Sequence, residues 1–377
     1  MTSKVHTHKE RQSLVWRLHL DLPLLAGLFA LMGFGLMVLY SAGGESESLI
    51  YRQVTRLGIG LAVMFMMAQF PPRFYAKWAP FLYLIGLVLL IAVIFFGDKS
   101  KGAQRWLMLG GFRFQPSELM KLAVPLMVAW YFSERPLPAR KRELFIAAVL
   151  VLVPTLLIAK QPDLGTALLI SSSGLFAIYL SGVSWRIIAG FVVAAVIFMP
   201  IHWFFLIHEY QKDRVYVYLE GIMNQTELCK QPDAWQICQS QVAIGSGGFD
   251  GKGWLNGTQS QLEFLPERST DFIFAVLGEE FGFTGVAILL SIYLFIIARG
   301  LYIGTQAQET FSRLLAGAIV LTFFVYLFVN IGMVTGLLPV VGLPLPLVSY
   351  GGTSMVTLLS GFGMLMSIYT HRKLVST

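Results

Sequence analysis

Charged residues are scarce in this sequence, and their scarcity excludes a water-soluble enzyme. Lys, Arg, Asp and Glu make up 13% of the 377 residues, whereas soluble domains carry about 25%. Apolar residues reach 56% and the mean hydropathy is +0.67, which also excludes a disordered chain. No basic patch interleaved with aromatic residues stands apart from the apolar segments, so the net charge of +7 does not indicate nucleic-acid binding. The composition predicts an all-α, polytopic integral membrane protein.

Familiar catalytic and metal-binding motifs are also absent. The sequence has no Gly-x-Ser-x-Gly, no His-Glu-x-x-His and no phosphate-binding loop. Only two cysteines occur, Cys229 and Cys238, with no histidine near them at zinc-ligand spacing. They form either one structural disulfide or two free thiols. We predict no metal site, so the chemistry must depend on carboxylates and basic side chains.

Long apolar runs predict about ten transmembrane helices, since one span takes about 20 residues. Polar residues, glycines and prolines separate the runs. The fourth and sixth runs are short and adjoin charges, which is typical of helices inside a bundle. No soluble domain fits between the runs, so residues 1–377 form a single membrane domain. The runs are 19–40, 53–69, 78–96, 118–132, 144–159, 164–181, 187–206, 271–298, 313–335 and 351–369.

The distribution of Lys and Arg predicts the orientation of these helices. With the N-terminus in the cytoplasm, most Lys and Arg of the short loops fall on the inner side, as the positive-inside rule requires. Both termini are then cytoplasmic, and residues 1–18 form a short cytoplasmic tail. Residues 207–270 form a long extracytoplasmic loop between the seventh and eighth helices. The glycine-rich run 245–253 predicts a tight re-entrant loop within it.

One basic segment breaks the orientation rule. Residues 98–121 lie on the predicted outer side, yet they carry Lys99, Lys101, Arg105, Arg113 and Lys121. An anionic partner at the outer face would explain this cluster. Anchoring to lipid headgroups, helped by the aromatic residues of the segment, explains it equally well. Composition alone leaves both interpretations open.

Ionisable residues at membrane depth indicate a functional site, because each is costly unless it is paired or hydrated. Glu118 and Lys121 share one helix face, either as a functional pair or as an ordinary intrahelical ion pair. Asp163 follows a proline and reads equally as a carboxylate that caps a helix start. Asp271 is expected to open the eighth helix behind a Ser or Thr N-cap at position 269 or 270.

Two further acids lie deeper in the same predicted helix. Glu279 and Glu280 follow Asp271 by about 12 Å along the axis. Because neighbouring helical residues diverge around the axis, at least one of them faces the interior of the bundle. They form either a proton pathway or an internally paired acidic end of the helix.

Six short motifs occur along nearly the whole chain: KGAQRW at 101–106, GFRFQPSE at 111–118, QPDLGT at 161–166, GKGW at 251–254, LPERSTDFIF at 265–274 and VSYGG at 348–352. Together they resemble the SEDS family (shape, elongation, division and sporulation) of peptidoglycan polymerases. Their number and order make the resemblance specific. The departures are minor: Ser269 stands where the family often has histidine, and Cys229 and Cys238 lie in an insert.

The resemblance implies a glycosyltransferase that polymerises lipid II into β-1,4-linked glycan, with inversion, at the outer face of the bacterial inner (cytoplasmic) membrane. Asp271 matches the family's essential aspartate, whose implied role is general base for the acceptor hydroxyl. Arg113 and Lys121 would offset the charge of the departing undecaprenyl pyrophosphate. A divalent cation could assist there, although no dedicated site is evident. The substrate-binding residues expected from the motifs are Lys101, Arg105, Arg113, Glu118, Lys121 and Asp163.

The resemblance also implies partners. Besides lipid II, the nascent glycan strand and the surrounding membrane lipids, a class B penicillin-binding protein is expected to supply peptide cross-linking, for which this chain has no serine motif. A flippase for the same lipid-linked precursor is the alternative function. The charges cluster at the predicted outer end of the helices, which favours chemistry there. A purely scaffolding role would leave these buried charges unexplained.

Overall fold

The structure is a computed structural model that describes residues 18–100, 103–109, 112–187, 189–190, 193, 197, 212, 216, 235–262, 265 and 267–372. Nine of its helices coincide with nine of the ten predicted runs, and the run 187–206 lies mostly outside the described residues. These helices are α2 (Leu22–Ala42), α3 (Glu47–Gln69), α4 (Pro72–Phe96), α5 (Pro116–Ser133), α6 (Lys141–Lys160), α7 (Leu164–Leu180), α13 (Ile273–Thr305), α14 (Thr310–Val334) and α15 (Thr353–Thr370). Two shorter helices, α11 (Trp235–Gly247) and α12 (Thr258–Gln261), precede α13.

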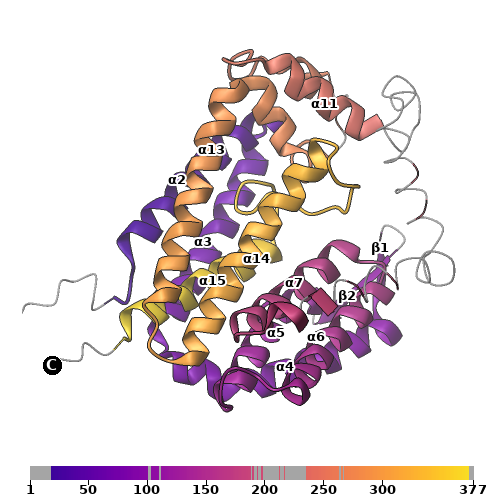
Figure 1. Cartoon of the computed structure of the whole chain (residues 1–377). Coiled ribbons are helices and arrows are strands. Elements are labelled where there is room, and N and C mark those ends of the chain that lie inside the picture. The colour runs from indigo at the N-terminus through magenta and orange to yellow at the C-terminus, as the bar shows by residue number, and fades with distance from the viewer. Residues whose placement is uncertain are drawn as a thin grey trace, which may run out of the picture.

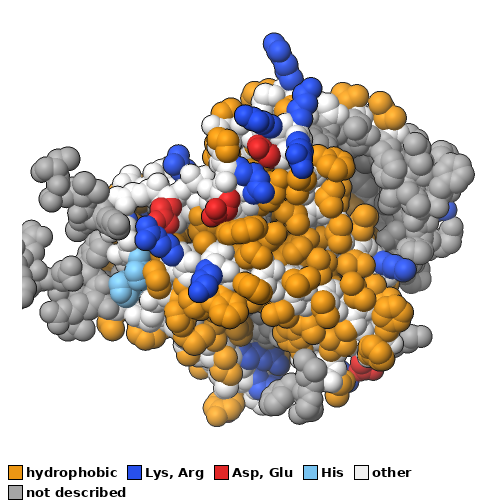
Figure 2. Space-filling view, turned by 90° about the horizontal axis from the view of Figure 1, so that it is seen from below, with side chains coloured by type: hydrophobic (Ala, Val, Ile, Leu, Met, Phe, Trp, Pro, Cys, Tyr) orange, Lys and Arg blue, Asp and Glu red, His pale blue; other side chains and the backbone are white. Residues whose placement is uncertain are grey.

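The helices are long and apolar enough to account for a multi-pass membrane protein. In the described part of the chain, seven of them satisfy the length and composition of a membrane span, and α7 is a shorter apolar helix of 17 residues. Large apolar side chains on α4, such as Leu84 and Val88, are exposed. Figure 2 shows a broad area of hydrophobic side chains with Lys and Arg in groups around it. Such surfaces suit hydrocarbon rather than water.

The bundle has two groups of helices with α14 between them. Figure 1 shows α4–α7 gathered on one side and α2, α3, α13 and α15 on the other. Helix α14 packs against α5 and α7 of the first group and against α13 and α15 of the second. Its apolar window is 72% buried, against 22% for α3. Helix α14 is therefore an interior helix that contacts both groups.

A small β-sheet corrects the prediction of an all-α chain. Strands β1 (Asp98–Ser100), β2 (Ala103–Leu109) and β3 (Phe112–Phe114) pair antiparallel in the order β1-β2-β3. On β2, Leu107 is buried and its neighbour Met108 is exposed, as the pleat requires. The basic segment is thus a folded sheet between α4 and α5, and not only a connection.

Two histidines bring the ends of the described chain together. The ring of His19, before α2, stacks on the ring of His371, after α15, with centroids 4.1 Å apart. Burial and the neighbouring His371 lower the pKa of His19 below its usual value. The start of α2 and the end of α15 therefore lie at one end of the bundle, which is compatible with two cytoplasmic termini.

The loop before α12 inserts into a break in α13. Gly282 has φ +60° and ψ −159° inside this helix. The chain resumes with Phe283 N–H donating to the Gly248 carbonyl (3.0 Å) and Thr284 N–H donating to the Phe249 carbonyl (3.1 Å). Gly251 also has a positive φ of +79°. The first residues of the predicted run, 245–247, are the end of α11, whereas 248–253 form a tight turn that satisfies main-chain groups freed by the break.

We expect Gly282→Ala to destabilise the protein by about 2 kcal/mol or more, because a non-glycine residue at positive φ is strained and because of close contacts. A Cβ at Gly282 would lie 2.4 Å from the Gly251 nitrogen and 2.6 Å from the Phe249 oxygen. The midpoint of thermal unfolding in detergent measures the loss. Gly33→Ala is the matched control, since a Cβ there meets nothing within 4 Å. Equal midpoints for the two variants would contradict this account of the break.

Candidate active site

Asp271 lies in the turn before α13 and not in its first turn. The helix begins at Ile273, and its N-cap, Phe272, makes no side-chain cap. The Thr270 hydroxyl donates instead to the Glu267 carbonyl at 3.1 Å. This corrects the expectation that Asp271 opens the helix behind a Ser or Thr cap. The turn is closed by main-chain bonds from Thr270 and Phe272 to Glu267.

The turn that carries Asp271 is held by the VSYGG motif. The Tyr350 N–H donates to the Ser269 carbonyl at 2.8 Å, and the Ser349 hydroxyl donates to the Thr270 carbonyl. Gln53 of α3 donates to the Ser349 carbonyl at 3.1 Å. Two motifs about 80 residues apart in sequence thus form one loop cluster beside Asp271.

Asn330 of α14 contacts the same turn. Its amide nitrogen donates to the main-chain carbonyl of Asp271 at 2.9 Å and to that of Leu343 at 2.7 Å. The residue before Leu343 is Gly342, with φ +73°, and a Cβ built on it would lie 3.6 Å from the Asp271 Oδ2. The Asp271 carboxylate therefore faces the 342–343 segment, and α14 anchors both.

Glu118 and Lys121 form a buried ion pair that includes a third group. Lys121 Nζ lies 2.6 Å from Glu118 Oε1 and donates to the Tyr326 hydroxyl, also at 2.6 Å. The second carboxylate oxygen of Glu118 is buried and has no hydrogen-bond partner among the described residues. The ion pair between Glu118 and Lys121 within α5 is therefore present, as the interpretation of an intrahelical pair predicts. Its contact with Tyr326 ties it to α14, so it is more than a local helix contact.

Asp163 caps α7 and lies beside Arg105 of β2. Its Oδ1 accepts the N–H of Thr166 at 3.2 Å, and its Oδ2 accepts the Gln115 amide at 3.1 Å. Arg105 Nε lies 3.9 Å from Oδ2, and the guanidinium also donates to the carbonyl of Pro162. The capping interpretation of Asp163 is thus confirmed. Its second carboxylate oxygen, Oδ2, also faces Arg105 of the sheet.

These groups converge on α14. Gly165, in the first turn of α7, packs so closely on Leu343 that an added Cβ would lie 2.9 Å from its side chain. Leu343 and Tyr326 belong to one buried cluster that bridges α7 and α14. Asp163 caps α7, the helix that this cluster joins to α14. Asp271 and the Glu118–Lys121 pair therefore contact one stretch of α14, and Asp163 lies at the start of a helix packed against it.

Other predicted residues lie apart from this cluster. The Arg113 side chain is 59% exposed, and it lies 3.6 Å from Asp98 at the edge of the sheet. Lys101 lies outside the described residues. Cys238 is buried in α11 and disulfide-bonded, whereas Cys229 also lies outside the described residues, so their pairing stays a prediction.

Glu279 and Glu280 are both buried, but they hold the inserted loop. Glu279 Oε1 accepts Lys252 Nζ at 2.7 Å and the Gln259 N–H at 3.0 Å. Glu280 accepts the Ser41 hydroxyl of α2. Among the two interpretations of these acids, the contacts favour internal pairing.

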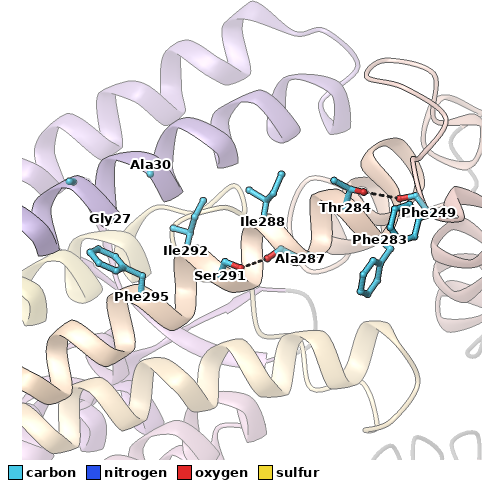
Figure 3. A pocket seen from close by; sticks show the side chains of 11 residues that line it. Gly27, Ala30, Phe249, Phe283, Thr284, Ala287, Ile288, Ser291, Ile292 and Phe295 are labelled. Atoms are coloured by element: carbon cyan, nitrogen blue, oxygen red, sulfur yellow. Dashed lines mark hydrogen bonds between the residues drawn. The ribbon is translucent and has the colours of Figure 1, made fainter.

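A groove between α2 and α13 does not belong to the candidate site. It encloses about 760 Å³ and is lined by apolar residues such as Ala30, Ile288 and Phe295. Its hydroxyls are internally satisfied: Ser291 donates to a main-chain carbonyl of its own helix, and Thr284 to that of Phe249 (Figure 3). None of its eleven lining residues belongs to the ionisable cluster, and they offer no group for acid–base chemistry.

Sequence reasoning missed Tyr326 and Asn330, the two residues of α14 that contact the predicted site. A signal was present, because both are polar groups in a long apolar run and lie four residues apart, on one helix face. A buried amide at membrane depth is costly unless it is hydrogen-bonded. No group of three or more His, Cys, Asp or Glu able to hold a metal occurs within the described ranges.

Fold and site together define a class: a multi-pass helical membrane protein with an acid–base cluster buried around one interior helix. The FtsW/RodA/SpoVE family model, described as "Cell cycle protein", matches residues 14–374. The chain therefore belongs to this family, which is the family that the motifs indicate.

Individual relatives agree with this assignment. The chain is 54% identical over 360 residues to the peptidoglycan glycosyltransferase MrdB of Escherichia coli, covering 96% of each sequence. It is 34% identical over 364 residues to MrdB of Helicobacter pylori, covering 95% of this chain and 92% of the relative.

Solved structures of relatives share the fold. RodA of Thermus thermophilus matches with a TM-score of 0.70 at 29% identity, covering 94% of this chain and 98% of the other. A second match, with a TM-score of 0.79 at 31% identity, comes from work on the coordination of polymerization and crosslinking by a peptidoglycan synthase complex, and covers 94% and 98%.

Proposed function

We propose that this chain is a peptidoglycan glycosyltransferase that acts in cell elongation and polymerises lipid II at the outer face of the inner membrane. The observation that carries the proposal is the contact of Asp271 and of the Glu118–Lys121 pair with one stretch of α14, against which α7, capped by Asp163, is packed. The identity of 54% to a glycosyltransferase over nearly the whole chain supports the activity.

The proposed reaction is a single displacement. The 4-hydroxyl of the acceptor N-acetylglucosamine attacks C1 of the donor N-acetylmuramic acid, and the bond from C1 to the pyrophosphate oxygen breaks. The hydroxyl proton goes to the Asp271 carboxylate, and undecaprenyl pyrophosphate leaves with the bonding pair. One base and one displacement account for inversion to a β-1,4 linkage.

Lys121 would offset the charge that develops on the departing pyrophosphate, since cations near a leaving phosphate stabilise the transition state. Glu118 and Tyr326 contact its ammonium group and would orient it. Arg105 would bind substrate beside Asp163. Arg113 and Lys101 lie in the basic segment at the proposed outer face, where the incoming anionic lipid would be attracted.

The topology proposed for this reaction places both termini in the cytoplasm and residues 207–270 outside. A class B penicillin-binding protein is the proposed partner. The likeness to a chain of a synthase complex in which polymerization and crosslinking are coordinated supports an assembly of this kind. The nascent glycan strand would pass from this chain to that partner.

The test is glycan synthesis by the purified protein given lipid II in detergent, alone and with the partner. Detergent leaves no two compartments, so lipid translocation cannot register. Glycan strands and released undecaprenyl pyrophosphate are expected. If no polymer forms even with the partner, the alternative of a flippase for the lipid-linked precursor takes precedence, and translocation in liposomes becomes the deciding measurement.

A further inference from the structure

Two polar side chains on α14 are not explained by helix packing. Tyr326 is 2% exposed and Asn330 is 0% exposed. They lie four residues apart, so they share one face and differ by about 6 Å along the axis. Each contacts a different part of the candidate site, which makes this face of α14 the structural link between those parts.

The amide of Asn330 has only one favourable orientation. Its nitrogen faces two main-chain carbonyl oxygens, those of Asp271 and Leu343, and its own oxygen is buried with no hydrogen-bond partner in the described part of the chain. Flipping the amide would place its oxygen against both carbonyls, where nothing can donate. The side chain thus uses both of its donors to hold the two segments that meet at the Asp271 carboxylate, and leaves its acceptor unsatisfied, which is costly in a buried site.

Tyr326 holds the side chain of Lys121 in a similar way. Its hydroxyl receives a hydrogen bond from Lys121 Nζ at 2.6 Å, and the ammonium also lies 5.3 Å from the centre of its ring. Among the described residues, the other hydrogen-bond partner of Lys121 is Glu118, on the same helix as the lysine itself. Tyr326 is therefore the residue through which Lys121 is hydrogen-bonded to α14.

We propose that Asn330 and Tyr326 are positioning residues, which together fix the separation between the Asp271 carboxylate and the Lys121 ammonium. Neither touches the reacting atoms. Asn330 acts through the main chain of Asp271, and Tyr326 acts through the side chain of Lys121. The inference rests on the proposed function, because the separation matters only if base and cation act on one substrate.

The test compares steady-state glycan synthesis by Asn330→Leu, Tyr326→Phe and wild type. For Asn330→Leu, which keeps the volume but has no donor, kcat is expected to fall about 10²-fold with KM nearly unchanged, since misplacing a catalytic group by 1 Å has effects of this size. Asn330→Ser, which retains one donor, should recover part of kcat. Tyr326→Phe, which loses one oxygen, should lower kcat by about tenfold.

Thr322→Val is the matched control. Thr322 lies one turn before Tyr326, and within the described ranges its hydroxyl donates to the Ala318 carbonyl of the same helix, at 2.6 Å, and to no other group. It should keep the wild-type kcat. In the Asp271→Asn background, Asn330→Leu should cause no further loss, because the two changes then remove the same contribution.

Two outcomes overturn the inference while leaving the proposed function intact. One is a kcat for Asn330→Leu equal to the kcat of the wild type, measured where the wild type itself makes glycan. The other is a fall in kcat that matches a fall in the folded fraction and persists in Asn330→Ser. If wild type itself makes no glycan, the proposed function fails first, and this inference fails with it.

Discussion

Replacing Asp271 by Asn is expected to lower the rate of glycan synthesis about 10³-fold, since a positioned general base contributes 10²- to 10⁴-fold. The amide is nearly isosteric with the carboxylate but accepts no proton at neutral pH. The main-chain carbonyl of Asp271 keeps its hydrogen bond from Asn330, and the turn keeps its own main-chain bonds. The variant should therefore fold and bind lipid II. Release of undecaprenyl pyrophosphate by purified protein measures the rate.

Glu267→Gln is the control for this experiment. Glu267 lies in the same turn, is exposed, and loses the same charge in the variant. Its backbone carbonyl, which closes the turn, is unaffected. Wild-type glycan synthesis by Glu267→Gln, with an unchanged midpoint of thermal unfolding for both variants, would assign the loss to the Asp271 carboxylate. Synthesis at the wild-type rate by Asp271→Asn would remove this residue from the reaction.

The apolar runs predicted the helices well because a membrane span leaves little choice of composition. The eighth run was nevertheless too short, since it ended at the charge of Arg299. That guanidinium is paired in a two-bond contact with Asp21 at the start of α2, so α13 continues to Thr305. A long-range partner made a charge compatible with the helix, and no local pattern contains that partner.

The β-sheet was missed although the sequence carried a sign of it. Two glycines separate the runs 103–109 and 112–114, and a two-residue glycine loop between such runs is a hairpin signal. The charges of this segment do not distinguish Arg105 from Arg113, whereas in the structure Arg105 contacts the start of α7 and Arg113 is exposed at the sheet edge.

The site was predictable in its members but not in its assembly. Motifs identified Asp163 and Asp271 as important residues, and spacing paired Glu118 with Lys121. What joins them is α14, whose Tyr326 lies more than 200 residues from Lys121 in sequence. Contacts at such separation depend on how the two groups of helices dock, and helix periodicity carries no information about docking.

Removing Lys121 is expected to lower both the stability of the protein and its glycan synthesis. The side chains of Lys121 and Glu118 are 7% and 9% exposed. Lys121→Met would leave a buried carboxylate without its cation, and breaking a buried pair in this way costs about 3–5 kcal/mol. We therefore expect both a large fall in the midpoint of thermal unfolding and loss of glycan synthesis.

The double variant Lys121→Met, Glu118→Leu resolves the two effects. Replacing a buried ion pair by apolar residues of similar volume is often neutral or stabilising, so the unfolding midpoint should return close to that of wild type. Glycan synthesis should stay absent, because no cation then faces the departing pyrophosphate. Recovery of both stability and synthesis in the double variant would show that the pair only stabilises α5, and would leave Lys121 without a role in the reaction.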